Sequence, residues 1–119
     1  MIIIEKTKIA IYCRVDNGGN KEAEEETIKV QRFKLEQYLK NNGLHLSEFY
    51  EDIGYPGYDL DRPGFQKLLA DYNDGKFEIV LVTSIDRLFR SSTQGKVKFP
   101  FYIKSLNSIE AGDKQSDEL

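Results

Sequence analysis

Residues 9–16 read Ile-Ala-Ile-Tyr-Cys-Arg-Val-Asp, an apolar run that ends in an arginine and an acid. The polar, glycine-bearing segment 17–20 follows directly. A short buried strand of an α/β sheet has this pattern, and such sheets bind their ligands at the carboxyl ends of their strands. We therefore expect any chemistry of this chain to begin at Arg14 and Asp16, although both residues also suit the solvated end of a purely structural strand.

Outward from this strand, the spacing of apolar residues predicts two helices and two further strands. The first helix, over residues 22–41, has one apolar face with Gln31 on or beside it. A strand follows at 44–50, and a glycine- and proline-bearing loop at 51–59. The second helix begins after Asp61, its expected cap, and ends near residue 73. The continuous apolar run at 77–82 is typical of a strand buried on both faces.

This alternation of strands and helices predicts an α/β fold, a three-layer αβα domain with a mainly parallel sheet. The core is expected to span residues 1–92. Residues 93–119 form a divergent carboxyl-terminal segment, whose apolar residues around Pro100 fit either a short helix or a strand. The last residues, 111–119, read as a polar tail.

Composition restricts the possible functions. The 119 residues carry a net charge of −3 and give a pI of about 5.2, which argues against broad nucleic-acid binding through many basic residues. The single cysteine, Cys13, excludes a disulfide framework and is interpreted as a small buried hydrophobe. The apolar start at residues 1–4 is too short for a signal sequence or a membrane span, so we expect a cytoplasmic protein without membrane contact.

A second group of charged residues, Asp86, Arg87 and Arg90, follows the last apolar run. Arg87 and Arg90 are three residues apart and so share one side of a helical turn. In a parallel sheet this strand end lies near Arg14 and Asp16, and several guanidiniums at one place suit a phosphate. The alternative is a structural ion-pair network in which the two acids neutralise the arginines.

Four short motifs then carry a resemblance. They are YCRVD at 12–16, TIKVQ at 27–31, DRPGF at 61–65 and IDRLFR at 85–90. Together and in this order, over residues 8 to about 92, they resemble the catalytic domain of the serine recombinases, which include resolvases, invertases and large serine integrases. The resemblance implies a resolvase-like domain that cleaves and exchanges DNA strands through a phosphoserine link, in a homo-oligomer (dimer or tetramer), with no metal and no other cofactor.

The resemblance also implies roles for individual residues. The arginines would stabilise charge on the scissile phosphate, an acid would orient them or handle a proton, and two further residues would help to hold the phosphate and nearby backbone. These positions correspond to Arg14, Arg87 and Arg90 for the charge, Asp86 for the acid, and Gln31 and Arg62 for the support.

The nucleophile departs from the family pattern. The family has a serine two residues after the first arginine, and this chain has Asp16 there, whereas Ser84, Ser91 and Ser92 stand outside the motif position. A carboxylate among arginines stays ionised and takes the place of a phosphate oxygen. If it attacked phosphorus, the product would be a hydrolysis-prone acyl phosphate. We therefore predict that this chain is cleavage-deficient as written.

The carboxyl end departs as well. Family catalytic domains continue into another strand and a long helix that builds the oligomer interface, followed by separate DNA-binding domains. Residues 93–119 show neither pattern, so strong DNA binding by this chain alone is not expected. Two alternatives stay open: a non-catalytic interaction or phosphate- and DNA-binding module on the same fold, and a phospho-acceptor domain with Asp16 as acceptor and Glu51 or Asp52 holding magnesium.

Overall fold

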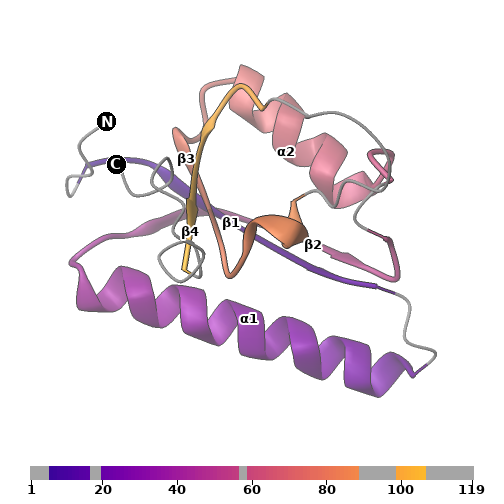
Figure 1. Ribbon diagram of the computed structural model, residues 1–119. Helices are drawn as coiled ribbons and strands as arrows, with labels where there is room; N and C mark the ends of the chain where they lie inside the picture. The colour runs from indigo at the N-terminus through magenta and orange to yellow at the C-terminus, as the bar shows by residue number, and fades with distance from the viewer. Residues whose placement is uncertain (1–5, 17–19, 57–58, 89–98, 107–119) are drawn as a thin grey trace.

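The computed structural model describes residues 6–16, 20–56, 59–88 and 99–106. Within them four parallel strands form one sheet in the order β2-β1-β3-β4 (Figure 1). In chain order the elements are β1 (Ile9–Val15), α1 (Lys21–Asn41), β2 (Leu46–Ile53), α2 (Pro63–Asn73), β3 (Ile79–Val82), the short 3₁₀ turn η1 (Ile85–Arg87) and β4 (Tyr102–Ser105).

Side chains alternate between the two faces of the sheet, and each face is covered by one helix (Figure 1). In β1, Tyr12 belongs to the buried cluster that contains α2, whereas Ile11 and Cys13 belong to the cluster that contains α1. Burial raises the pKa of the Cys13 thiol to about 12, as befits a cysteine that only fills space. The predicted three-layer α/β fold with a parallel sheet is confirmed.

Helix α1 is the clearest element in the sequence. Its N-cap Asn20 accepts a hydrogen bond from the Ala23 amide at 3.1 Å, and acidic residues in the first turn favour the positive end of the helix. The predicted buried face is confirmed, with Ile28, Gln31, Leu35 and Leu39 against the sheet. None of the helices in the described segments is long and apolar enough to cross a membrane.

Strand β2 runs three residues into the segment predicted to be a loop. It pairs with β1 along its full length, and Cys13 and Arg14 lie opposite Glu51 and Asp52. The turn comes only at Gly54, which has a φ of 87° and donates its N–H to the Val15 carbonyl at 2.8 Å. Pairing with a buried neighbour therefore extends β2 beyond the point where local turn residues favour a break.

The cap of α2 differs from the sequence prediction. Asp61 does not cap this helix; the N-cap residue is Arg62, whose side chain makes no capping hydrogen bond. Instead the carboxylate of Asp52 accepts the Gly64 and Phe65 amides at 2.7 and 2.9 Å. A residue of β2 thus caps the next helix, a contact between distant positions that local sequence does not reveal.

The sheet continues past residue 92. Strand β4 pairs with β3 in parallel, with Ile79 opposite Tyr102 and Val82 opposite Ser105. The expectation that the core ends at 92 therefore places its boundary too early. The strand has only four residues, and Tyr102 at its start is exposed, so it lacks a regular alternating pattern. The polar tail lies outside the described residues.

Between β2 and α2 the carboxylate of Asp71 accepts the Tyr50 hydroxyl at 2.6 Å, and Lys67 and Lys76 lie 3.5 and 3.7 Å away. The hydrogen bond, with help from the lysines, lowers the pKa of Asp71. A carboxyl whose pKa is lower in the folded state contributes stability above its unfolded pKa of about 4, and this contribution is lost as pH falls.

We therefore expect Tyr50→Phe to destabilise the protein at pH 7 and the difference from the wild type to shrink as pH falls below 4. Urea unfolding at pH 7, 5, 4 and 3 measures this. A difference that grew on acidification would contradict the direction of the Asp71 shift.

Candidate active site

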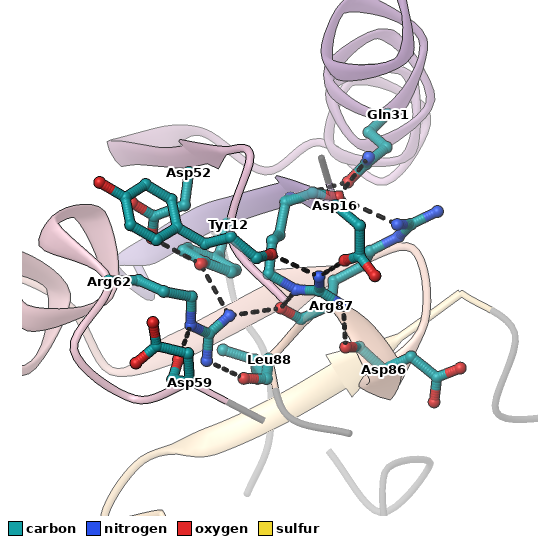
Figure 2. Close-up of polar contacts among 11 residues, drawn as sticks. Tyr12, Asp16, Gln31, Asp52, Asp59, Arg62, Asp86, Arg87 and Leu88 are labelled. Carbon is teal, nitrogen blue, oxygen red and sulfur yellow. Dashed lines mark hydrogen bonds and ion pairs between the residues drawn. The ribbon is translucent and has the colours of Figure 1, made fainter. Parts of the chain in front are cut away.

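The candidate site lies where the order of the strands reverses. Strands β1 and β3 are neighbours in the sheet, but their pairing ends at Ile11 and Leu81. Beyond that point the end of β1 faces η1, which follows β3, and Figure 2 shows the polar contacts between them. Open α/β sheets bind ligands at such a position, outside the carboxyl ends of their strands. The expected meeting of the two strand ends is therefore observed.

Arg14 is fully buried, and its guanidinium contacts four acceptors. Its Nε donates to the Arg87 carbonyl at 2.9 Å, and its Nη2 donates to the Asp86 carbonyl at 2.8 Å. Its Nη1 donates to the Tyr55 carbonyl at 2.9 Å and also pairs with the Asp16 carboxylate. Arg14 thus ties the end of β1 to η1 and to the loop after β2.

The two acids proposed for this site behave differently. Asp16 pairs with Arg14 through its carboxylate, and its side chain remains 43% exposed. Asp86 contacts Arg14 through its backbone carbonyl, while its exposed carboxylate points away from the other labelled side chains (Figure 2). Asp16 is therefore the acid whose carboxylate compensates the buried charge of Arg14.

Gln31 and Arg87 form hydrogen bonds with the main chain of Arg14. The Gln31 amide reaches from α1 and makes a reciprocal pair: its Nε2 donates to the Arg14 carbonyl at 2.9 Å, and its Oε1 accepts the Arg14 N–H at 3.2 Å. The Arg87 Nη1 donates to the same carbonyl at 3.0 Å. The backbone that carries Arg14 is thus fixed from two elements. Arg90, Ser91 and Ser92 lie outside the described residues.

Arg62 is a second fully buried arginine. Its Nε donates to the Asp59 carbonyl at 2.6 Å, its Nη1 donates to the Arg87 carbonyl at 3.1 Å, and its Nη2 donates to the Leu88 carbonyl. The guanidinium also lies over the ring of Phe65, 4.7 Å from the ring centroid. Burial lowers the pKa of Arg62. The residue therefore binds the same turn as Arg14, from the side of α2.

Sequence reasoning gave Tyr12 no role of its own and considered Asp52 only as a possible magnesium ligand. The Tyr12 hydroxyl donates to Asp52 at 2.7 Å and accepts from Arg62 Nη1 at 3.0 Å, so it links the cap of α2 to the buried guanidinium (Figure 2). Burial raises the pKa of Tyr12, and the phenol stays protonated at neutral pH. Strand alternation is the signal that could have found it, because Tyr12 lies two residues before Arg14 and faces the same side.

The magnesium alternative loses support at Asp52. Three protein donors hold its carboxylate, namely the Tyr12 hydroxyl and the amides of Gly64 and Phe65, and the residue is 3% exposed. Within the described part of the chain, His, Cys, Asp and Glu side chains form no group of three that could hold a metal ion. The geometry instead favours an arginine-centred site.

The comparison with known families decides the identity of this fold. The model of the resolvase N-terminal domain matches residues 9–106, which span β1 to β4. The chain belongs to the resolvase family. The family model matches this resolvase domain beyond residue 92, which agrees with the position of β4.

Solved structures similar to this resolvase domain are serine recombinase catalytic domains. The N-terminal catalytic domain of TP901-1 integrase is 38% identical, with a TM-score of 0.61 over 71% of this chain and 60% of that one. The C-terminal catalytic domain of ISC1926 TnpA, an IS607-like serine recombinase, is 29% identical, with a TM-score of 0.61 over 71% and 56%. A serine recombinase from Sulfolobus solfataricus is 29% identical, with a TM-score of 0.59 over 73% and 56%. The chain thus spans less than two thirds of the length of these structures.

Proposed function

We propose that this chain is the catalytic domain of a site-specific DNA recombinase of the serine type in which Asp16 replaces the nucleophile and prevents cleavage. The observation that carries the proposal is the pairing of the Asp16 carboxylate with the buried guanidinium of Arg14 at the carboxyl end of β1. The resolvase match and the similarity to an integrase and a transposon-type recombinase support DNA as the substrate class. The full-length protein is proposed to act as a dimer or tetramer.

The chemistry of the two side chains explains the loss of cleavage. A serine hydroxyl at this place attacks phosphorus, loses its proton, forms a 5′-phosphoserine bond and releases a 3′-hydroxyl, which can later reverse the step. Attack by the Asp16 carboxylate would give an acyl phosphate that water hydrolyses, so the bond energy needed for rejoining would be lost. Its negative charge also repels the incoming phosphate.

The remaining site residues divide into two groups in this proposal. Arg87, Arg90 and the Nη1 edge of Arg14 stabilise charge on the phosphate. Arg62, Gln31 and Asp86 hold these groups in place, because their observed contacts are to the backbone of the site or to its arginines. The step needs neither a metal nor another cofactor, since the arginines supply the positive charge.

Removing the Asp16 carboxylate is expected to open the arginine cluster to anions. We expect Asp16→Ala to bind inorganic phosphate on the order of tenfold more tightly than the wild type, because the charge-assisted contact between Asp16 and Arg14 no longer competes with phosphate. Calorimetric titration with phosphate measures the difference in affinity. Asp16→Asn keeps the size of the side chain but not its charge, and its phosphate affinity is expected to lie between those of the wild type and Asp16→Ala. Equal affinities in all three proteins would contradict a phosphate site at Arg14.

Restoring the nucleophile tests the reaction itself. In a full-length serine recombinase that carries this domain in place of its own, Asp16→Ser is expected to form a covalent protein–DNA adduct on that recombinase's site. The unchanged domain and the matched control Asp16→Ala are expected to form none. Denaturing gels with labelled DNA detect the adduct. An adduct from the unchanged domain, or none from Asp16→Ser while the chimera still binds its site, would overturn the assignment.

A non-catalytic module on the same fold is the second candidate. The observation in its favour is that Arg14 and Arg62 are fully buried and bonded mainly to backbone carbonyls, as expected of arginines that serve the fold. Under this alternative the chimera with Asp16→Ser forms no adduct, whether or not the module binds phosphate. The adduct experiment above therefore separates the candidates.

A further inference from the structure

The outer face of α1 carries an apolar patch. Phe33 and Val30 are 63% and 45% exposed, although both are large apolar residues. They lie on the side of α1 opposite Gln31 and Leu35, which face the sheet, and no described element lies beyond that side (Figure 1). Exposed apolar side chains that cluster on one face often mark an interaction surface.

Charges flank this patch in a defined order. Glu26, Phe33 and Lys40 follow one another at intervals of seven residues, so they form one stripe along the outer face of α1. Glu26 and Lys40 each lie about 10 Å from Phe33 along the helix axis. Both are exposed, and one end of the stripe is acidic whereas the other is basic.

A stripe with this order is complementary to itself. When two such helices pack antiparallel with Phe33 against Phe33, Glu26 of each copy lies opposite Lys40 of the other. A parallel arrangement would instead place Glu26 against Glu26 and Lys40 against Lys40, which like-charge repulsion disfavours. Contact between identical patches about a two-fold axis is also the usual form of a homodimer.

We propose that the Glu26–Phe33–Lys40 stripe is a homodimer interface in which two copies of this chain pack their α1 helices antiparallel about Phe33. Val30 extends the apolar centre beside Phe33, and the aliphatic stems of Lys29 and Lys34 border it. The interface gives a surface for the oligomer of the proposed function and rests on that part of it. It uses no residue of the candidate active site, so its test can fail while the assignment of Arg14 and Asp16 stands.

The size of the interface sets the expected strength. A single helix pair buries less than the roughly 1,200–2,000 Å² of a standard stable interface. We therefore expect a dimer that dissociates on dilution, with a Kd on the order of 10–100 μM. Sedimentation velocity of the full chain at a series of concentrations spanning this range measures the equilibrium.

Charge reversal tests the antiparallel arrangement. Glu26→Lys and Lys40→Glu each turn two attractive pairs into two repulsive ones, so each is expected to raise Kd about tenfold. The double variant restores opposite charges across the axis and is expected to return Kd close to the wild-type value. Phe33→Glu is expected to abolish the dimer. Far-UV circular dichroism verifies that each variant is folded.

Asp74→Lys provides the matched control. It changes the net charge by the same amount as Glu26→Lys. Asp74 is an exposed residue at the end of α2, on the other face of the sheet. We therefore expect the Kd of the dimer to stay unchanged. Three results would overturn the proposal: a monomer at every concentration, a dimer that persists in Phe33→Glu, or a double variant that stays as weak as the single ones.

Discussion

Replacing Arg62 with leucine is expected to lower the free energy of unfolding by about 4 kcal/mol. The buried guanidinium donates to the Asp59, Arg87 and Leu88 carbonyls and to the Tyr12 hydroxyl, and leucine leaves all four acceptors without this donor. A domain of this size has a stability of roughly 5–15 kcal/mol, so the loss is a large fraction of the total. Urea unfolding measures it as a lower midpoint with an unchanged slope.

Arg32→Leu is the matched control. Arg32 is also an arginine near an aromatic ring, with its guanidinium carbon 3.9 Å from the Phe49 centroid, and it pairs with Glu36 at 2.9 Å. Its side chain is 44% exposed, so water replaces the lost contacts and the cost is expected to stay within about 1 kcal/mol. If Arg62→Leu and Arg32→Leu lowered the free energy of unfolding by similar amounts, Arg62 would not be the residue that links α2 to the turn after β3.

Much of the fold was predictable because its decisive patterns are local. The apolar run of β1 and the period of Ile28 and Leu35 in α1 can be read from neighbouring residues, and both elements are observed. Parallel packing then follows from the alternation of strands and helices. The sequence did not decide between a helix and a strand at β4. Four residues at the edge of a sheet bury too little surface to give a regular alternation of apolar and polar residues.

The contacts that could not be predicted connect residues far apart in sequence. The capping of α2 by Asp52 and the Tyr12–Asp52 hydrogen bond span 12 and 40 positions. The Tyr12–Asp52 contact depends on the register of β1 against β2, in which Arg14 lies opposite Asp52, and the cap depends on how α2 packs after β2. A carboxylate in a turn-rich segment carries no local sign of this partner, and Asp61, which precedes the helix, is the more obvious cap.

The proximity of Arg14 to the turn after β3 was predicted, but the atoms that make the contacts were not. Parallel strands explain why Arg14 meets the turn after β3, and the meeting is observed. Sequence shows which residue types are present, but it does not show that the acceptors are mostly backbone carbonyls, since every residue carries one. For this reason the carboxylate of Asp86 was expected to contact the arginines, whereas its carbonyl does so.

Gly64→Ala is expected to lower the free energy of unfolding by about 3 kcal/mol. A Cβ at this position would lie 2.4 Å from the Glu51 carbonyl oxygen and 2.9 Å from the Asp52 carboxylate, so the start of α2 must move away from β2. That movement stretches both capping hydrogen bonds from Asp52. Urea unfolding measures the loss. Gly43→Ala is the control, because a Cβ there meets nothing within 4 Å and only the positive φ of 66° opposes it, at a cost of about 1 kcal/mol.

A double-mutant cycle then separates the clash with the Glu51 backbone from the effects that involve the Asp52 carboxylate. If Gly64→Ala acts through the cap, Asp52→Ala costs less in the Gly64→Ala background than in the wild type, because the same hydrogen bonds cannot be lost twice. The two changes together are expected to destabilise the protein by at least 1 kcal/mol less than the sum of the single changes. Strict additivity would show that the close approach of Gly64 to the Glu51 backbone is the whole cause. The side chain of Asp52 would then contribute to α2 independently of the glycine.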